Sequence, residues 1–419
     1  MVCVMISSLL AHTDALPGGH TKAASYRSFT HHEAEYGIED AIKVARMEYA
    51  NIKETHAFAE THDIDCASLP CDTVDIMYSA GHFENGKRAI ARMRETMGAD
   101  DPAAAYGVYS AEDARSRFLT PDALGAITYE AGSVSAYKLV IGMLEVCLTR
   151  GLNLQTNTPV TGITASSSST AEKPLWVANT PRGPITTGAL LLATNGYTAH
   201  ILPQFQGTIV PLRGQVQAQR PGASLPNKGS LSRTYSFIYD SGYEYMITRP
   251  QSTARSSHIP DAGTMVIGGG LGMLPGSGPE EYGITTDDAM NDRISDYLTS
   301  CTQRYFGPNW GDDSKQGRVK SQWSGIMGTS ADGLPYVGPV DGMPGVWMSA
   351  SFNGHGMVMC LKCAQALVGM VFGEAEWKEW FPKCCVLSKE RLNMKFEGRL
   401  NMRAPGEAEF ASSNGSSKL

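Results

Sequence analysis

The sequence has no surplus of positive charge. Its 35 Lys and Arg residues are outnumbered by 42 Asp and Glu residues, giving a formal net charge of −7. Proteins that bind nucleic acids neutralise phosphates with clustered Lys and Arg, so we expect no nucleic-acid partner. No apolar run approaches the ~20 residues of a membrane-spanning helix. With 42% hydrophobic and 18% charged residues, the chain is typical of a globular protein without a membrane span.

The sequence also lacks the cysteine pattern of a disulfide-rich protein, because nine cysteines are an odd number in a long chain. Cys360 and Cys363 form a C-x-x-C motif, and Cys384-Cys385 follows about twenty residues later, a spacing compatible with zinc. However, the first pair lies in an apolar run, where thiols usually belong to the core. We expect no metal site.

A dinucleotide-binding glycine loop is missing as well. Such a loop needs a strand, then G-x-G-x-x-G opening a helix, and an acid about twenty residues later. The glycine-rich run Ile267–Gly272 is followed by Met273-Leu-Pro-Gly-Ser-Gly278, which cannot open a helix. We interpret it as glycines in a strand where two backbones approach closely, and no other segment matches the motif.

What the chain does contain is a strand, a glycine turn and a helix near its C-terminal end. Residues Gly345–Ser351 predict an apolar strand, Asn353–Gly356 a small-residue turn, and Met357–Met370 a buried helix. Backbone N–H groups at such a helix start, together with the helix dipole, favour an electron-rich or anionic ligand. The alternative is an ordinary strand–turn–helix connection.

The rest of the pattern alternates helices with strands around a β-rich insertion. It predicts helices over Glu33–His62, Asn85–Met97, Ser135–Arg150 and Asp287–Phe306, and strands over Asp75–Ser79, Asn153–Thr156, Leu175–Asn179 and Ile185–Thr194. Residues 209–220 and 235–270 have the texture of a second, antiparallel sheet. We therefore expect a discontinuous α/β domain with another domain inserted into it.

Eight short motifs, each weak alone, occur in a specific order: GGHTKAASYRSF, AGSVSAYKLV, LQTNTPVTGI, LLLATNGYTAHILP, IVPLRGQV, YMITRP with MVIGGG, GIMGTSADGLPYVG and SFNGHGM. In this order they resemble the D-amino-acid oxidase superfamily of FAD-dependent oxidoreductases, which includes sarcosine, glycine and γ-glutamylputrescine oxidases. The resemblance covers nearly all of residues 16–372.

This resemblance implies an α/β fold, with a discontinuous Rossmann-like FAD-binding domain and an inserted α+β antiparallel-sheet substrate domain. The expected FAD-binding parts are 1–72, 135–208 and 321–375, the substrate parts are 73–134 and 209–320, and 376–419 forms a peripheral extension and flexible tail. Only about sixteen residues precede the GGH motif, so the first βαβ unit, which carries G-x-G-x-x-G in the family, is expected to be missing. We expect an N-terminally truncated sequence, or one that begins too late.

The resemblance also implies site residues. It places the Gly18-Gly19-His20 turn near a flavin ring and Val160 at the adenosine end. Thr194, Asn195 and Gly196 would lie beside the cofactor, and Asn353, Gly354, His355, Gly356 and Met357 at the pyrimidine edge of the ring. Candidate substrate-facing residues are Tyr245, Arg249, Lys22 and Arg27. No flavin-attaching cysteine is evident, so we expect non-covalent FAD.

The expected reaction is oxidation of a C–N bond in an amine or amino acid by hydride transfer to flavin N5, with oxygen as acceptor and hydrogen peroxide as product. The alternatives are a non-catalytic remnant of the fold and a flavin dehydrogenase that uses a partner acceptor. The chain ends in Ser417-Lys418-Leu419 on a Gly/Ser-rich segment, the signal read by the peroxisomal import receptor. We expect a peroxisomal protein, with the cytoplasm as the alternative.

Overall fold

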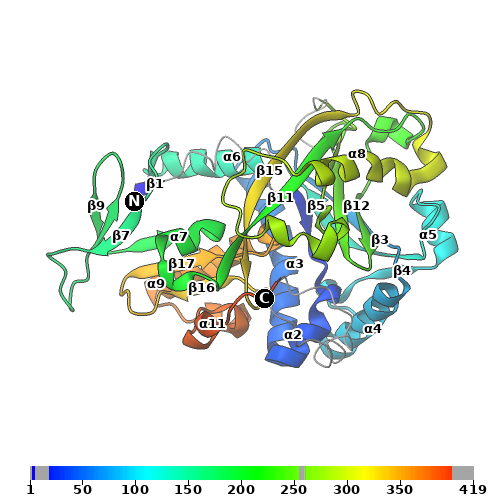
Figure 1. Ribbon diagram of the computed structural model, residues 1–419. Helices are drawn as coiled ribbons and strands as arrows, with labels where there is room; N and C mark the ends of the chain where they lie inside the picture. Colours follow the sequence, from blue (N-terminus) through cyan, green and yellow to red (C-terminus); the bar gives the residue numbers. More distant parts are fainter. Residues whose placement is uncertain (1, 5–17, 254–258, 260, 399–419) are drawn as a thin grey trace, which may run out of the picture.

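A large mixed sheet forms one half of the molecule (Figure 1). The computed structural model describes residues 2–4, 18–253, 259 and 261–398. Within them, this sheet has nine strands in the order β15-β11-β14-β13-β12-β3-β5-β2, with β4 paired to β5. The strands are β2 (His20–Lys22), β3 (Leu69–Met77), β4 (Gly107–Tyr109), β5 (Gly125–Ser133), β11 (Ile209–Gln219), β12 (Thr234–Tyr239), β13 (Gly242–Thr248), β14 (Met265–Gly268) and β15 (Val319–Ser330).

The two faces of this sheet differ because side chains alternate along each strand. On β12, Tyr235 and Phe237 join an apolar core with Phe306 of α8 and Trp310. The intervening Thr234 and Ser236 are buried on the opposite face. One face therefore packs on α8 (Asp292–Phe306), and the other face carries polar groups.

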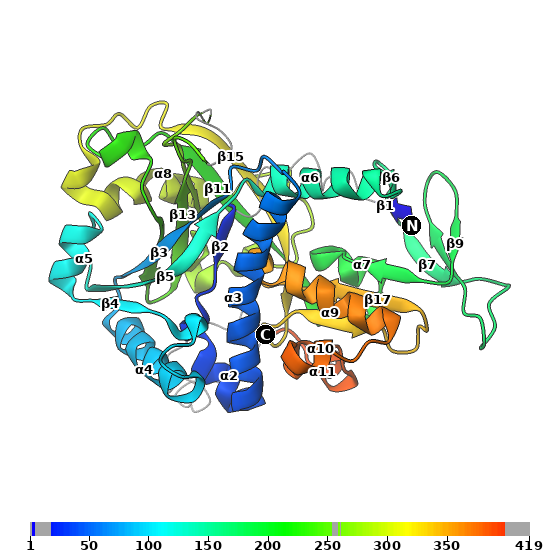
Figure 2. The same cartoon turned by 180° about the vertical axis from the view of Figure 1, so that it is seen from behind.

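The remaining helices lie around this sheet and a smaller one. They are α2 (Phe29–Tyr36), α3 (Ile38–Thr61), α4 (Ala80–Met97), α5 (Ala111–Arg117), α6 (Ala136–Thr149), α7 (Thr198–Ile201), α9 (Cys360–Phe372), α10 (Trp377–Trp380) and α11 (Lys389–Asn393). Figure 2 shows α3 standing between the large sheet and α9, and α3 contacts α2, α4 and α9. No helix in the described part of the chain has both the length and the apolar character to cross a bilayer.

The smaller sheet contains one parallel and one antiparallel pair of strands. In it β10 (Leu190–Leu192) pairs in parallel with β17 (Val346–Ala350), and β16 (Tyr336–Pro339) pairs antiparallel with β17. A separate parallel pair joins β1 (Val2–Val4) to β6 (Asn153–Gln155), and β7 (Gly162–Ala165), β8 (Trp176–Asn179) and β9 (Ile185–Thr187) form a third small sheet. The expected mixed α/β architecture is confirmed, while the discontinuous Rossmann-like domain, its missing first βαβ unit and the domain boundaries stay predictions.

Two segments that were each predicted as a single element are divided in the structure. The helix predicted over Glu33–His62 is two helices, α2 and α3, because Gly37 between them adopts φ 84°, a left-handed conformation that glycine accommodates most easily. The strand predicted over Ile185–Thr194 is also two elements, β9 and β10, which belong to different sheets. Periodicity located these segments but did not resolve the breaks.

The glycine run at the end of β14 does not open an α-helix. It leads through Gly270, which has φ 85°, into a 3₁₀ turn over Leu271–Met273. A β-carbon on Gly269 would lie 2.8 Å from the carbonyl oxygen of Tyr243 on the neighbouring strand. The interpretation as a close approach of two backbones is confirmed.

The C-terminal segment packs into the molecule. Phe381 and Cys385 are buried with Cys363 of α9 in one apolar cluster. Arg391 of α11 is also buried, donates to both carboxylate oxygens of Asp332 and stacks on the Tyr336 ring at 4.1 Å. Residues 381–391 thus contribute to the core beside α9, although the sequence places them in a peripheral extension. Ser417-Lys418-Leu419 lie outside the described residues, so the peroxisomal destination stays a prediction.

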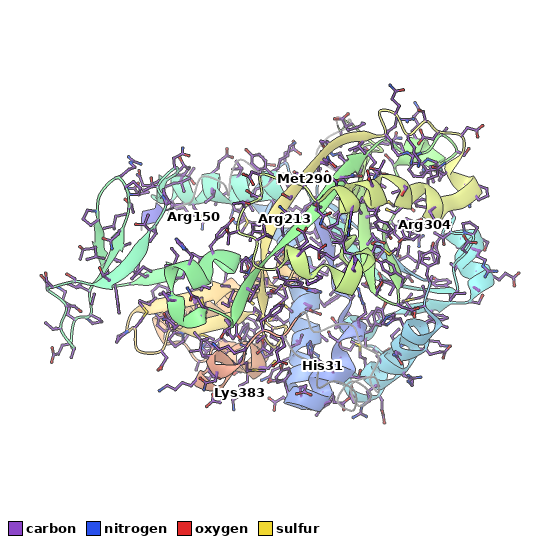
Figure 3. All side chains as sticks on the ribbon, in the orientation of Figure 1. His31, Arg150, Arg213, Met290, Arg304 and Lys383 are labelled. Carbon is purple, nitrogen blue, oxygen red and sulfur yellow. The ribbon has the colours of Figure 1, made fainter. Side chains whose placement is uncertain are left out.

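The labelled side chains of His31, Arg150 and Lys383 are exposed (Figure 3). Glu48 differs, because it is buried on α3 with the Ser25 hydroxyl donating to it. Burial raises the pKa of Glu48 to about 7, and the serine hydrogen bond offsets only part of that rise. A carboxyl that must ionise inside the protein makes the folded state less stable as pH rises.

Replacing Glu48 with Gln therefore has an effect that depends on pH. Because the folded pKa lies above the unfolded one, the contribution of Glu48 is complete below the unfolded pKa and is lost as pH rises through about 7. Between about pH 4 and about pH 8, wild type should lose about 3 kcal/mol of unfolding free energy relative to Glu48→Gln. Urea unfolding measures this. Glu39→Gln, at an exposed position of α3, should show no such trend.

Candidate functional site

A cavity of about 1130 Å³ lies between the polar face of the large sheet and the loop that follows β17. Its lining comes from β2, α3, α6, β10, β11, β13 and α9. Ordinary small-ligand pockets have volumes of about 300–1,000 Å³. The cavity is therefore large enough for an extended ligand together with a smaller molecule.

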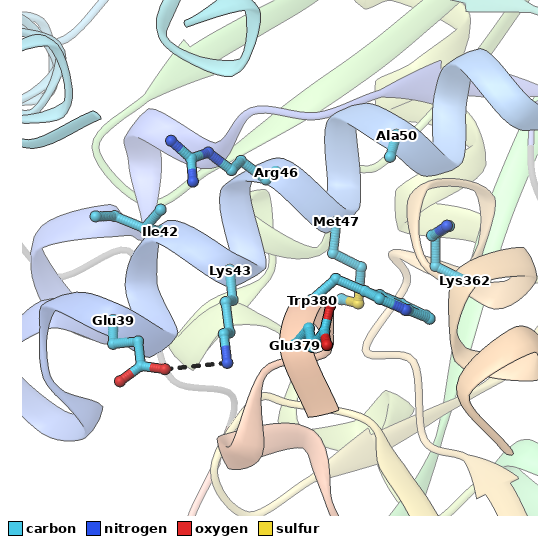
Figure 4. Close-up of a pocket in the computed structure, with 9 residues that line it drawn as sticks. All are labelled: Glu39, Ile42, Lys43, Arg46, Met47, Ala50, Lys362, Glu379 and Trp380. Atoms are coloured by element: carbon cyan, nitrogen blue, oxygen red, sulfur yellow. Dashed lines mark ion pairs between the residues drawn. The ribbon is translucent and has the colours of Figure 1, made fainter. Parts of the chain in front are cut away.

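A second cleft, of about 440 Å³, lies between α3 and α10 (Figure 4). Its three cations are each paired with a carboxylate: Lys43 with Glu39 at 3.0 Å, Arg46 with Asp101 at 2.8 Å and Lys362 with Glu54 at 2.8 Å. Because these charges already neutralise one another, we place the candidate site in the larger cavity.

One wall of the larger cavity rests on a polar ladder, which we define as Thr73 and Asp75 of β3 with Thr234 and Ser236 of β12. Parallel pairing puts Thr73 opposite Thr234 and Asp75 opposite Ser236. All four side chains are buried. Two adjacent polar rungs therefore cross a sheet whose opposite face is apolar.

The two cavity-lining side chains of β2 each contact one residue pair of the polar ladder. His20 Nε2 lies 2.6 Å from Thr234 Oγ1 and 3.3 Å from Thr73 Oγ1. Lys22 Nζ donates to Ser236 Oγ at 2.6 Å and forms an ion pair with Asp75. Residues 20 and 22 of a strand point to the same face, so β2 presents an imidazole and an ammonium group side by side.

Asp75 is the buried anion of this wall. Tyr26 and Tyr129 donate their hydroxyls to Asp75 Oδ2 at 2.8 and 2.9 Å. Burial opposes ionisation, but the charges of Lys22 and Arg27 and these hydrogen bonds outweigh it and hold the pKa of Asp75 below its usual value. Burial also lowers the pKa of Lys22, and the ion pair with Asp75 opposes that shift.

Aromatic rings continue the wall along β13. The Tyr245 ring fits between two glycines, because a β-carbon on Gly18 would lie 2.8 Å from Tyr245 Cε2 and one on Gly268 would lie 2.3 Å from Tyr245 Oη. The guanidinium of Arg27 stacks over the Tyr243 ring at 4.4 Å. Tyr243, Tyr245 and Arg27 all line the cavity, so the cations of this wall lie beside aromatic surfaces.

The opposite wall is the turn after β17, where the backbone supplies the polar groups. Gly354 adopts φ 80°, and the chain then enters a 3₁₀ turn over Gly356–Val358 and the helix α9. Within the described part of the chain, the N–H groups of Gly354 and Gly356 donate to no protein oxygen. Both glycines line the cavity. This edge offers two backbone hydrogen-bond donors at the 3₁₀ turn, which ends just before α9 begins at Cys360.

Two asparagine side chains hold this turn in place. Asn195 Oδ1 accepts from the backbone N–H groups of Ser351 at 3.0 Å and Phe352 at 3.2 Å. Asn353 Oδ1 accepts from Ser330 N–H at 2.8 Å, and Asn353 Nδ2 donates to Ser330 Oγ at 2.9 Å and to Ser351 O at 2.8 Å. The turn is thus attached to the end of β15 and to the segment after β10.

The far end of the cavity is aliphatic. Val140 of α6, Leu191 of β10 and Val368 of α9 line it with 37%, 50% and 47% of their surfaces exposed. Residues 361, 364 and 367 of α9 extend the same apolar lining. The polar chemistry of the site is therefore concentrated between the sheet wall and the turn after β17.

A family model described as DAO, FAD dependent oxidoreductase, matches residues 9–370. The chain belongs to the DAO family. This confirms the resemblance seen in the motifs, and members of the family bind FAD. A search of the curated proteins gives no match.

Solved structures agree on the fold. The chain is similar to glycine oxidase from Geobacillus kaustophilus, with a TM-score of 0.62, 15% identity and coverage of 89% of both chains. It is similar to iminodiacetate oxidase from Chelativorans sp. BNC1, with a TM-score of 0.63, 15% identity and coverage of 90% of this chain and 96% of that one. It is also similar to L-proline dehydrogenase from P. horikoshii, with a TM-score of 0.61, 13% identity and coverage of 91% and 96%.

The donor set of the turn fits the ring end of the DAO-family cofactor. The pyrimidine edge of a flavin is rich in acceptors and gains negative charge on reduction. Gly354 and Gly356 line the cavity, and their N–H groups have no acceptor in the described part of the chain, so they suit such an edge. For the pyrophosphate end, no strand followed by G-x-G-x-x-G and a helix occurs among the described residues.

The structure brings most of the predicted site residues together. Ten of them line the one cavity: Gly18, His20, Lys22, Arg27, Asn195, Tyr245, Gly354, His355, Gly356 and Met357. They come from segments more than 330 positions apart in the sequence. The fold brings these segments together around β2, β13 and the turn after β17. This grouping supports the roles proposed below.

Others lie behind the cavity wall. A β-carbon on Gly19 would lie 1.7 Å from Val134 O, and one on Gly196 would lie 2.6 Å from Met327 O, so both glycines permit close backbone packing. Thr194 Oγ1 lies 2.8 Å from Thr198 Oγ1. The Asn353 side chain holds the turn by accepting a hydrogen bond from the Ser330 N–H group. Val160 packs against the apolar cluster of the small sheet.

Arg249 requires a correction. It was predicted to face the substrate, but it does not line the cavity, and its guanidinium lies 3.9 Å from Asp261 with 45% of the side chain exposed. The physical reason is that β13 ends at Thr248, so residue 249 has left the sheet face that carries Tyr243 and Tyr245.

Sequence reasoning missed Asp75, Ser236 and Tyr243. Their partners come from strands far apart in the chain, so no local spacing connects them. The one available signal was an Asp inside the apolar strand Thr73-Val-Asp-Ile-Met77, because a carboxylate in such a strand is buried only with partners.

Replacing Asn353 with Ala should destabilise the turn. The change removes three hydrogen bonds and leaves the buried Ser330 N–H without its acceptor, which costs about 2–3 kcal/mol. Ala is also less favourable than Asn at φ 54°, by about 1 kcal/mol. Urea unfolding measures the sum.

The matched control is Asn157→Ala. Asn157 is exposed, adopts φ 52° and makes no side-chain hydrogen bond within the described residues, so its replacement should cost only the conformational part. Equal losses for the two variants would contradict the role of the Asn353 side chain.

Proposed function

We propose that this chain is an FAD-dependent amine or amino-acid oxidase. It would oxidise the C–N bond of its substrate, with oxygen as acceptor and hydrogen peroxide as product. The observation that carries the proposal is that the donor turn at Gly354 and Gly356 and the cationic, aromatic wall at Lys22 and Tyr245 border the same cavity. A bound ring on the turn would therefore leave a substrate space next to Lys22.

The residues of the chain would divide the work between cofactor and substrate. Gly354, Gly356 and Met357 would hold the ring edge, and Lys22 and Arg27 would attract a substrate carboxylate. Tyr243 and Tyr245 would exclude water from the reacting carbon. When bound, FAD would supply the hydride acceptor for the substrate carbon next to nitrogen, and the resulting imine would be hydrolysed.

Non-covalent attachment is proposed because members of the DAO family bind FAD non-covalently. Cys360, an exposed cysteine at the start of α9, lines the cavity.

A dehydrogenase is the second candidate, because L-proline dehydrogenase is among the structural neighbours. It would use the same cavity and the same C–N chemistry but pass electrons to another acceptor. Measuring which electron acceptor supports turnover distinguishes the oxidase from the dehydrogenase. The absence of turnover with any acceptor indicates a non-catalytic remnant of the fold.

Addition of FAD to the purified chain should produce a protein-bound absorption band near ~450 nm. Substrates such as glycine, sarcosine, iminodiacetate and L-proline should bleach this band anaerobically, and oxygen should restore it with release of peroxide. Bleaching that only an artificial dye reverses would indicate the dehydrogenase. Absence of both the band and any turnover would contradict both enzyme proposals.

Replacing Lys22 with Met should weaken the use of carboxylated substrates. Loss of a charge-assisted hydrogen bond of about 1.5–3 kcal/mol corresponds to an increase in KM of about 10- to 100-fold. The methyl ester of the same amino acid should show little change, because it lacks the anion. Lys53→Met, at an exposed lysine paired with Glu130, is the matched control. An equal effect on acid and ester would contradict the assignment of Lys22.

A further inference from the structure

Among the described residues, Asp75 is the one anion that contacts the cavity-lining Lys22. Its carboxylate is fully buried on β3, and it does not line the cavity itself. Lys22 lines the cavity, 8% of its side chain is exposed, and its ammonium pairs with this carboxylate. The acid therefore acts on any ligand only through the lysine.

The contacts around Lys22 fix the orientation of its ammonium group. Nζ is held by Asp75 Oδ1 and by Ser236 Oγ at 2.6 Å, and it lies 5.7 Å from the centre of the Tyr129 ring. Both acceptors belong to the polar ladder and lie on adjacent strands in register. A flexible side chain is thus fixed at the sheet wall.

The other groups that face Lys22 give a mixed electrostatic setting. Arg27 and the burial of the site oppose the charged amine, Asp75 favours it, and the Tyr243 hydroxyl favours it weakly. His20 lies beside it on β2, and burial keeps the pKa of His20 well below its usual value, so the imidazole is neutral. Asp75 is therefore the group that maintains the positive charge of Lys22.

Tyr26 and Tyr129 both donate to Oδ2 of Asp75, whereas Lys22 contacts Oδ1. The two tyrosine hydroxyls therefore hold the oxygen of the carboxylate that Lys22 does not contact. They fix the position of the carboxylate independently of Lys22. The acid is thus a fixed element and the lysine the group that it orients.

We propose that Asp75 is a positioning residue that holds the Lys22 ammonium, oriented and charged, at the cavity wall for an anionic group of the ligand. This deepens the proposed function and rests on it for the identity of the ligand as a carboxylated amine. The placement of the lysine itself rests only on the chain.

The test is to titrate Lys22 in the full chain without FAD or substrate. The titration is monitored by NMR of lysines labelled with ¹³C at Cε, and the Lys22 signal is the one that is missing in Lys22→Met. Wild-type Lys22 should be protonated at neutral pH. In Asp75→Asn its titration should move down by one unit or more, a tenfold change in proton affinity. Asp72→Asn, at an exposed position of the same strand, should leave it unchanged.

The corresponding kinetic readout is a pH profile. KM for a carboxylated substrate should rise about tenfold in Asp75→Asn at alkaline pH and much less at acidic pH, whereas a purely structural role would change stability at every pH. A neutral Lys22 in wild type at pH 7 overturns the proposal even if Asp75→Asn fails to fold, and so does an unshifted titration in a folded variant. A shifted titration in a chain without oxidase activity supports the positioning role and separates it from the proposed function.

Discussion

The alternation of side chains across the large sheet is the constraint on which the site depends. Because successive residues point to opposite faces, β12 can give Tyr235 and Phe237 to the core under α8 while it gives Ser236 to the polar ladder. The same strand thus stabilises the fold and carries the site. A shift of one residue in the register of β3 or β12 would bury Asp75 among apolar side chains and expose aromatic ones.

The opposite wall is made in a different way, from backbone and not from side chains. The turn after β17 presents the N–H groups of Gly354 and Gly356, and Asn195 and Asn353 supply the side chains that hold it. Asparagine suits this task because it tolerates positive φ and both donates and accepts hydrogen bonds. The two asparagines therefore shape the site by shaping its backbone, and Asn353 does so from behind the lining.

Between these walls the cavity has a polar centre and an aliphatic end. Leu191 on β10 and Val368 on α9 remain half exposed there, although strands and helices usually bury such side chains. The donors at the turn and the cations Lys22 and Arg27 line the polar part. This separation of polar and aliphatic lining is the basis on which a ring and a substrate are proposed for the polar part of the cavity.

The sequence by itself determined the family, the mixed α/β class and the place of the turn at 353–356, since ordered motifs and local periodicity are encoded along the chain. It also located Lys22, Arg27 and Tyr245, which line the cavity. Only the tertiary structure decided what these residues contact. Lys22 meets Asp75 and Ser236, 53 and 214 positions away, and Arg249 leaves the cavity because its strand ends one residue earlier. Such partners follow from strand pairing and register, which depend on the packing of the whole sheet.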